Sequence, residues 1–324
     1  MSSALAKEIR ALVDLYCSEP GHREAMLCAL GQPGFVLHPE APRRAGTLTL
    51  EVYQAISGAL SIAAIQGAAG VELQMEAAYL FDRVADRETG SGQGLSAAEE
   101  LALAITMQTC GAAAACEAVH RAKGNGVGLR PLLLLFENCV RACAGQFMDA
   151  RLEKRNVATT DEALNMTSLK AGSLGRFAAE FGAGLATDET ETIRLCGDLG
   201  FNLLTYAQLM DDLRDACPVV YAEGDLARHK KTLPLVFFYD SLLKSSPPDG
   251  EVRTWASSGE GYPDTCLEFE RSGARVFSAI IAEVFLNRAK SNLVDLRGRV
   301  VEVKGLEDLL DSLVGSSART VVVS

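Results

Sequence analysis

The chain has 324 residues, of which 48% are hydrophobic and only 6% aromatic, and its formal net charge at pH 7 is −11. A length of this order holds one large domain or two ordinary ones, and a composition rich in Ala, Gly and Leu favours closely packed helices over a β-sandwich. The negative charge argues against a nucleic-acid partner or an anionic membrane surface, but it is compatible with divalent cations.

Hydrophobic periodicity predicts a succession of helices. In chain order, they are expected over residues 4–17, 22–30, 48–88, 97–122, 131–155, 161–184, 188–221, 233–244 and 264–290. Within 48–88 we predict two helices with a break near Gly67 and Gly70, and Ser96 with Glu99 forms a plausible capping box for the next helix. The tail from residue 299 predicts one short helix and a frayed end. Without sustained strand alternation or an internal repeat, the pattern predicts one all-α domain over residues 1–324.

The compartment follows from the cysteines and the apolar runs. The nine cysteines include no CxxC pair, so a zinc site is not expected, and free thiols are typical of a reducing cytosol. Residues 1–17 carry charges throughout and do not resemble a signal peptide. No apolar run reaches the length of a membrane helix, so we expect a cytoplasmic protein without a stable membrane span.

Two acidic clusters each follow an apolar segment. YAQLMDDLRD, residues 206–215, carries Asp211, Asp212 and Asp215 within about one helical turn, where like charges repel each other. Asp82 and Asp86, in AAYLFDRVADRE, are four residues apart and therefore lie on one face of a helix. Both clusters are compatible with ordinary solvated helix faces, but their repetition favours a common role.

That role is a metal site. Mg²⁺ takes oxygen ligands, usually one or two carboxylates together with substrate phosphates and water. Two facing Asp clusters are therefore expected to hold several Mg²⁺ ions, about three once a diphosphate is bound. The repulsion within YAQLMDDLRD is tolerated if cations occupy the gap.

Further polar residues fit a diphosphate site. An isolated lysine is normally a solvated surface charge, but lysines near a phosphate are natural donors. The candidates are Gln146 and Asp149 in AGQFMD, Lys170 in SLKAGSL, Gln208 three residues before Asp211, and Lys230 in HKKTLP.

Taken in order, these segments resemble the motifs of the all-trans isoprenyl diphosphate synthase superfamily. The resemblance covers about residues 25–245, which leaves the helices and tail of 251–324 outside the motif-bearing core. It rests on GVELQMEAAYLFDRVAD, AGQFMD, SLKAGSL, YAQLMDDLRD and HKKTLP. Each segment is weak evidence alone, but five in the family's order are specific.

The resemblance implies a fold and a reaction. The fold is an isoprenoid-synthase helical bundle around a deep apolar cavity, assembled as a homodimer. The reaction is the Mg²⁺-assisted departure of diphosphate from an allylic prenyl substrate, with Asp82, Asp86, Asp211 and Lys170 as catalytic residues. Metal ions stabilise charge on a leaving group, and an apolar cavity protects the carbocation from water.

The departures from the family's pattern concern the first metal-binding motif, which keeps Asp82 and Asp86, and the acceptor site. Arg83 stands where the family has the second Asp of its first motif, and Met75 stands where it has a His. The Gly-Lys-x-x-Arg segment is replaced at best by APRRAG with Arg43 and Arg44, and Arg87 is a remaining cation. An isopentenyl diphosphate would lose most of its charge-assisted hydrogen bonds there.

We therefore expect the prenyl cation to cyclise internally, as in class I terpene synthases built on this scaffold. One alternative is transfer to another acceptor, as in the bacterial enzymes that prenylate a pheromone tryptophan. Others are elongation with an unusual isopentenyl diphosphate site and a non-catalytic subunit of an active synthase. Ala77 and Ala78, one turn before Asp82, predict an open pocket floor for substrates of C15 to C20 or longer, although small residues also permit close helix packing.

Overall fold

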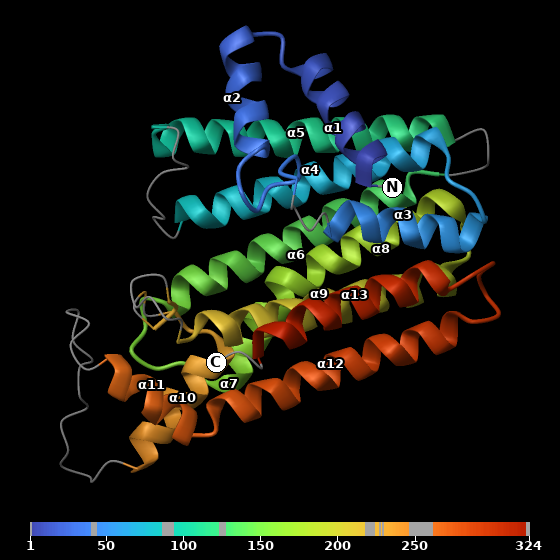
Figure 1. Ribbon diagram of the computed structural model, residues 1–324. Helices are drawn as coiled ribbons and strands as arrows, with labels where there is room; N and C mark the ends of the chain where they lie inside the picture. The colour runs from blue at the N-terminus through green and yellow to red at the C-terminus, as the bar shows by residue number, and fades with distance from the viewer. Residues whose placement is uncertain are drawn as a thin grey trace. The chain divides into compact units, whose positions relative to one another are not determined.

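The structure is a computed structural model, which describes residues 2–39, 44–85, 94–122, 128–217, 224–226, 228, 230–245 and 262–321 (Figure 1). These residues are almost entirely helical, and the only bridge between extended residues in them is an isolated one that joins Arg297 to Val300. The predicted all-α class is confirmed.

The described residues form a series of helices. In chain order they are α1 (Ser2–Tyr16), α2 (Pro20–Leu30), α3 (Arg44–Ser57), α4 (Ile62–Ala85), α5 (Ala97–Ala122), α6 (Arg130–Leu152), α7 (Thr160–Thr167), the π-helical turn η2 (Ser168–Gly172), α8 (Ser173–Ala186), α9 (Thr190–Asp215), α10 (Leu233–Ser245), α11 (Tyr262–Arg271), α12 (Ala274–Leu296) and α13 (Lys304–Val321).

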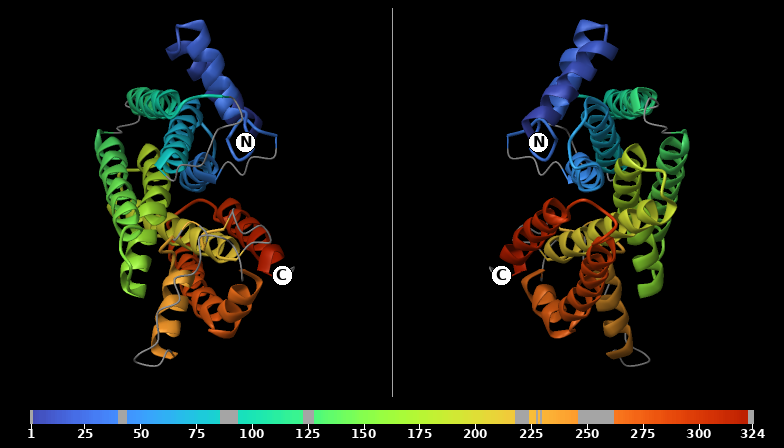
Figure 2. Two further views of the ribbon diagram at one scale, coloured as in Figure 1. Left: turned by 90° about the vertical axis from the view of Figure 1, so that its left-hand side faces the viewer. Right: turned by 90° about the vertical axis from the view of Figure 1, so that its right-hand side faces the viewer.

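The chain forms two compact units. Unit 1 comprises Met1–Cys139, Leu174–Gly200 and Asn292–Leu309, and unit 2 comprises Val140–Ser173, Phe201–Ser291 and Leu310–Ser324. In unit 1, α1 contacts both α2 and α4, and Figure 2 shows α1 and α2 in dark blue as a neighbouring pair. The single domain expected from the sequence stays a prediction.

Helix α4 forms the centre of unit 1, and it packs along α5 through small residues. A Cβ atom on Gly70 would lie 2.6 Å from the carbonyl oxygen of Gly111, so the two backbones are in direct contact at this crossing. The predicted break near Gly67 and Gly70 is therefore wrong. The helices separate instead at residues 58–61, where Gly58 adopts a φ of 78° that other residues rarely adopt.

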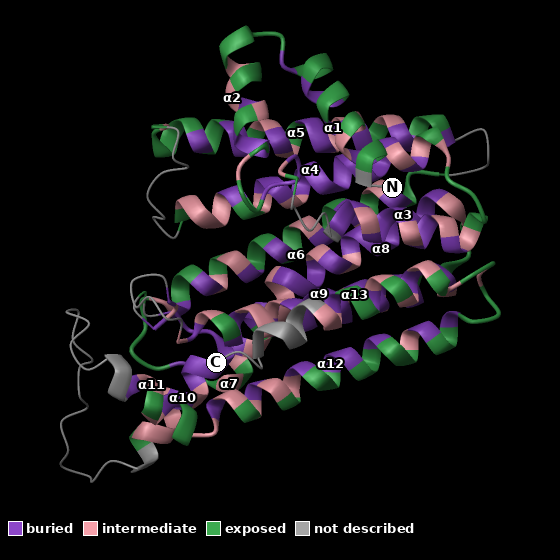
Figure 3. Ribbon diagram, viewed as in Figure 1, coloured by how far each residue is buried: buried purple, intermediate pink, exposed green. Residues whose placement is uncertain are grey.

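The start of α5 confirms the capping box. The backbone N–H of Ser96 donates to Glu99 Oε2 over 2.7 Å, and the N–H of Glu99 donates to Ser96 Oγ over 3.3 Å. The helix is also long and apolar enough, by length and composition, to cross a membrane, which the sequence analysis did not recognise. Half of its most apolar stretch is buried within the protein, and this burial is typical of a core helix (Figure 3).

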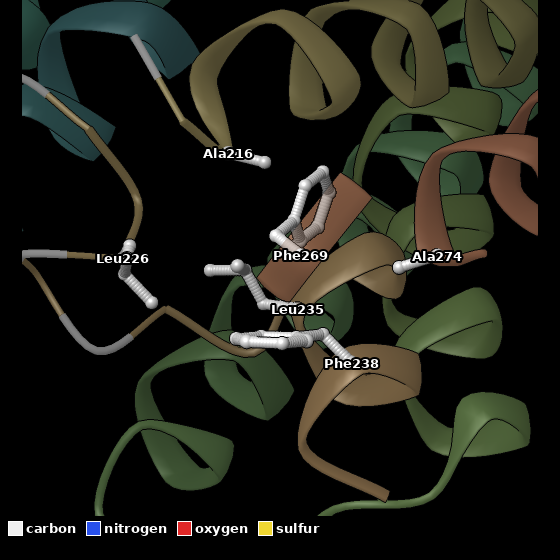
Figure 4. Packing of buried hydrophobic residues seen from close by; sticks show 6 residues of the cluster. All are labelled: Ala216, Leu226, Leu235, Phe238, Phe269 and Ala274. Atoms are coloured by element: carbon white, nitrogen blue, oxygen red, sulfur yellow. The ribbon is translucent and has the colours of Figure 1, made fainter. Parts of the chain in front are cut away.

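In unit 2, a small apolar cluster fixes the loop that follows α9. Its members are Ala216, Leu226, Leu235, Phe238, Phe269 and Ala274 (Figure 4). The rings of Phe238 and Phe269 meet edge to face with centroids 5.6 Å apart, a favourable aromatic geometry. The cluster ties the end of α9 and the loop residue Leu226 to α10 and α11, so it positions the polar residues between them.

Two predicted helices are interrupted, and one is longer than expected. The segment 264–290 is divided into α11 and α12 at Gly273, whose φ of 79° is incompatible with a right-handed helix. The segment 161–184 contains the π-helical turn η2. In the tail, α13 extends over 18 residues, because its leucines Leu306, Leu310 and Leu313 recur at helical spacing and are buried.

Candidate active site

The three aspartates of YAQLMDDLRD lie in the last turns of α9 and have different environments. Asp212 is buried, with 5% of its surface exposed, whereas Asp211 and Asp215 are half-buried. Residues 211 and 215 are one turn apart on the same face of the helix. Position 212 is rotated away from that face, which explains why the cluster has one interior and two outer carboxylates.

Arg214 provides the two outer carboxylates with a counter-ion from the same helix. Its guanidinium lies 2.8 Å from Asp211 and 3.2 Å from Asp215. Burial alone would lower the pKa of Arg214, but the charges of Asp211 and Asp215 outweigh it and raise the pKa. The sequence analysis missed this role, although the i, i+3 spacing of Asp211 and Arg214 could have indicated it.

Burial shifts the pKa of Asp212 upward, in the direction opposite to its effect on the pKa of Arg214. Desolvation raises the pKa of its carboxyl well above the ordinary range, and the negative charge of Asp225 adds to the shift. Gln208 Nε2 donates a hydrogen bond to Asp212 Oδ1 over 2.8 Å, which partly offsets the shift because it favours the charged form. The structure thus shows that Gln208, which the sequence analysis predicted as a site residue, is hydrogen-bonded to Asp212.

Asp225 is a further member of this group that the sequence analysis missed. Desolvation, followed by the charge of Asp215, raises the pKa of Asp225 to about 6. Its backbone N–H donates to the carbonyl of Asp215 over 2.8 Å, and its own carbonyl accepts from the N–H of Lys230 over 3.1 Å. Only its position five residues before Lys230 could have indicated from the sequence that Asp225 belongs to this group. Because Asp225 lies in a loop, no helical periodicity assigns it to the same face as other site residues.

Two lysines approach one buried carboxylate in the same unit. Lys170 Nζ lies 2.8 Å from Asp149 Oδ2, and Lys230 Nζ lies 4.0 Å from the same oxygen and 2.5 Å from Glu153 Oε1. Asp149 and Lys230 are both buried. The structure therefore brings together three predicted residues from α6, η2 and the loop before α10. Gln146, also predicted, is half-buried on α6.

The first acidic cluster lies at the end of α4 in unit 1. Asp82 is half-buried there, whereas Asp86 and Arg87, together with Arg43 and the side chain of Arg44, lie outside the described residues. The guanidinium carbon of Arg83 lies 5.8 Å from the ring centroid of Phe35, a cation–π distance. Ala77 is fully buried and Ala78 is half-buried, so both predicted floor residues are small side chains in packed surroundings.

Helix α4 also buries two acidic side chains that the sequence analysis did not single out. Glu72 accepts a hydrogen bond from the backbone N–H of Gly46, the last residue of APRRAG. One turn later, desolvation and the charge of Glu72 raise the pKa of Glu76 well above its ordinary value. This part of unit 1 therefore places the Glu72 carboxyl group beside the segment for which the resemblance implies cationic residues.

The carboxylates of unit 2 fit Mg²⁺ only as part of a larger complex. Within the part of the chain that the structure describes, no group of three or more His, Cys, Asp or Glu side chains is arranged to hold a metal ion. Mg²⁺ does not require such a cage, because it usually binds one or two carboxylates and completes its shell with phosphate oxygens and water. The raised pKa values of Asp212 and Asp225 fit an acidic group whose charge a cation would stabilise.

Parts of the chain are similar to known proteins. Residues 96–249 match the family model of the polyprenyl synthetases. A short chain isoprenyl diphosphate synthase of Methanothermobacter thermautotrophicus is 28% identical over 187 residues, which are 55% of this chain and 57% of that protein's length. The tryptophan prenyltransferase ComQ of Bacillus spizizenii is 29% identical over 254 residues, 78% of this chain and 83% of that protein.

The fold comparison extends over nearly the whole chain. The crystal structure of a polyprenyl synthetase from Streptomyces coelicolor A3(2) has a TM-score of 0.76 and 19% sequence identity, and it covers 98% of this chain and 97% of that one. The architecture is thus the all-α isoprenoid-synthase fold. The family match over residues 96–249 covers a little less than half of the chain, and together with the curated relatives it supports a relationship to the all-trans isoprenyl diphosphate synthases.

Proposed function

We propose that this chain is an isoprenoid synthase of the trans-prenyltransferase type, which releases diphosphate from an allylic prenyl diphosphate. The observation that carries the proposal is the composition of the group in unit 2. Lys170 and Lys230 converge on Asp149, and the same unit holds Asp211, Asp212 and Asp215. Cations for a phosphate and carboxylates for a metal are the two requirements of this chemistry.

The residues divide the work between metal and anion. Asp211, Asp212 and Asp215, together with Asp82 and Asp86, are the proposed Mg²⁺ ligands, and the metal would supply positive charge that stabilises the departing diphosphate. Lys170 and Lys230 would exchange part of their contact with Asp149 and Glu153 for phosphate oxygens. Gln208 holds the Asp212 carboxylate in one orientation through its hydrogen bond.

For the cation that remains, we propose internal cyclisation of a C15 to C20 or longer chain. Met75 in place of the family's His, and the buried acid Glu72 that accepts a hydrogen bond from Gly46, support the loss of an isopentenyl diphosphate site. A second candidate, transfer to an acceptor other than isopentenyl diphosphate, is favoured by the similarity to a tryptophan prenyltransferase over 78% of the chain.

The test uses purified protein with Mg²⁺ and farnesyl or geranylgeranyl diphosphate, with assays for pyrophosphate and for extractable products. Pyrophosphate with a cyclic hydrocarbon or alcohol is the expected result. Pyrophosphate that appears only when a tryptophan-containing peptide is added would favour the second candidate. A requirement for isopentenyl diphosphate would establish ordinary elongation, and the absence of turnover under all three conditions would contradict catalysis and favour a regulatory subunit.

Chain length gives a prediction at Ala78. Replacing Ala78 by Phe adds a large side chain one turn before Asp82, so we expect the longest accepted allylic diphosphate to shorten from C20 towards C10. The measurement is the ratio of turnover with geranyl and geranylgeranyl diphosphates. Ala98→Phe, on the exposed first turn of α5, is the control and should leave the ratio unchanged. An unaltered preference in Ala78→Phe would contradict an open floor at this position.

Helix α6 supports the proposed homodimer. Leu133, Phe136, Val140 and Phe147 are exposed and recur at intervals of three, four and seven residues, so they form one apolar stripe. The same stripe on a second copy would cover it, because an interface with two-fold symmetry pairs a surface with itself. Such a stripe is the kind of seam through which helices associate.

We therefore expect Val140→Glu, which places a charge in the middle of the stripe, to convert the protein to a monomer. Val140 is 70% exposed, so the substitution costs the isolated fold little. Light scattering measures the mass in solution. Val276→Glu, at a similarly exposed position on α12, is the control. A dimer that persists in Val140→Glu would show that the stripe is not the interface.

A further inference from the structure

The turn that carries Lys170 has an unusual backbone. Residues Ser168–Gly172 form a π-helix between α7 and α8, closed by a hydrogen bond from the N–H of Ser173 to the carbonyl of Ser168. A π-helical turn widens the helix by one residue per turn, and such turns occur mostly as single insertions that are frequent at functional sites. Because an α-helix is the better local arrangement, the surrounding residues have to maintain the wider one.

Two glycines allow the turn to be held between neighbouring helices. On one side, a Cβ atom on Gly145 of α6 would lie 2.7 Å from Lys170 Cα and 2.8 Å from the carbonyl carbon of Leu169. On the other side, a Cβ atom on Gly172 would lie 2.6 Å from both Phe201 Cε2 and Thr205 Oγ1 of α9. The first contact is with backbone, which cannot move aside as the end of a flexible side chain can.

The contact at Gly145 also sets the distance of an ion pair. Asp149 follows Gly145 by one helical turn on α6, and its Oδ2 accepts from Lys170 Nζ over 2.8 Å. The same helix therefore fixes both the backbone of Lys170 and the carboxylate that its side chain contacts. A methyl group on residue 145 would push the turn away from α6. The distance between Lys170 Nζ and Asp149 Oδ2 would then increase, and the separation of Lys170 from Lys230 would change.

We propose that Gly145 is a positioning residue: its missing side chain lets α6 hold the π-helical turn at the place where Lys170 reaches Asp149. The step from this geometry to diphosphate binding rests on the proposed function, whereas the geometry itself does not. Gly145 acts only through Lys170 and touches no substrate in this proposal.

The first experiment measures the geometry without any substrate. Purified Gly145→Ala is exposed to a limiting amine acetylation reagent, and the rate of modification of Lys170 is followed by peptide mass spectrometry. We expect Lys170 to react several times faster than in the unaltered protein, because its partner Asp149 is no longer in reach. Gly315→Ala, a helical glycine with nothing within 4 Å of an added Cβ, should leave the rate unchanged.

A second variant approaches the turn from its other side. Gly172→Ala should accelerate the modification of Lys170 as well, and it provides the test if Gly145→Ala does not fold by circular dichroism. An unchanged rate in a folded Gly145→Ala, or in a folded Gly172→Ala when the first variant is unfolded, overturns the proposal. A general rise at every lysine would mean lost stability and would also overturn it.

The second experiment separates a positioning role from a merely structural one. The affinity for inorganic pyrophosphate with Mg²⁺ is measured by calorimetry in a double-mutant cycle of Gly145→Ala and Lys170→Ala. We expect Gly145→Ala to weaken binding about tenfold in the presence of Lys170 and to have little effect in its absence. Equal losses in both backgrounds would contradict action through Lys170. If the unaltered protein binds no pyrophosphate, the proposed function fails, and the acetylation rates still decide the role of Gly145.

Discussion

Replacing Asp212 by Asn is expected to reduce diphosphate release about 100- to 1000-fold while stabilising the fold at pH 8. The loss follows because an amide cannot provide the negative charge that a metal ion requires. The gain follows because Asp212 is buried and burial raises the pKa of its carboxyl, so ionisation in the folded state is costly. Asn keeps an oxygen that accepts the hydrogen bond from Gln208 Nε2.

The pH dependence identifies the cause of this gain. With a pKa raised in the folded state, Asp212 contributes stability that is present below its unfolded pKa and is lost as pH rises towards the folded pKa. Asp212→Asn should therefore match the unaltered protein near pH 4 and exceed it by about 1–2 kcal/mol at pH 8, measured by urea unfolding. Asp295→Asn, on an exposed position of α12, is the control for both assays. Full turnover in Asp212→Asn would exclude a catalytic role for Asp212.

The largest loss of stability is expected from Gly70→Val. The added Cβ would lie 2.6 Å from the carbonyl oxygen of Gly111 and 3.1 Å from the Cβ of Ala114, so α4 and α5 must separate to admit it. Overpacking of this kind costs about 1–3 kcal/mol and occasionally more, and here both groups nearest the new side chain belong to the partner helix. We expect a decrease in the free energy of unfolding near the upper end of that range.

Thermal and urea unfolding of Gly70→Val measure this cost. A smaller substitution at the same site, Gly70→Ala, should change stability in the direction opposite to Gly→Ala in an open helix. In an open helix Gly→Ala is stabilising, as we expect for Gly315→Ala, because alanine favours the helical backbone. Gly70→Ala should destabilise instead, because its single methyl already meets the backbone of Gly111. If Gly70→Ala were stabilising, the contact between α4 and α5 would be looser than described.

Long stretches of hydrophobic periodicity predicted the helices. The motifs predicted which residues are candidates for the site in unit 2. Asp149, Lys170 and Lys230 were chosen from three separate segments, and the structure places both lysines beside one carboxylate oxygen of Asp149. The pairing of Asp149 with both lysines could not be predicted, because it depends on how α6, η2 and the loop before α10 pack. Their roles in catalysis stay predictions.

The remaining differences between prediction and structure arise where the same local sequence is compatible with two structures. Gly67 and Gly70 were interpreted as helix breakers, whereas they permit close packing, and it is Gly58 that adopts the positive φ. A π-helical turn differs from an α-helical one by a single residue, so no spacing in SLKAG predicts it. Tertiary contacts with α6 and α9 hold it in place.

The ion pairs of Arg214 with Asp211 and Asp215 have a consequence for the order of events in a reaction cycle. Arg214 offsets one of the two outer carboxylate charges at this helix end, so a free divalent ion that binds alone gains less than it would from two uncompensated carboxylates. Diphosphate would add negative charge that favours binding of the divalent ion. It would also provide Arg214 with a second anionic partner. We therefore expect metal and substrate to enhance each other's binding, which calorimetric titration of Mg²⁺ with and without pyrophosphate measures. Without diphosphate, such a site would hold divalent ions less firmly than in its presence.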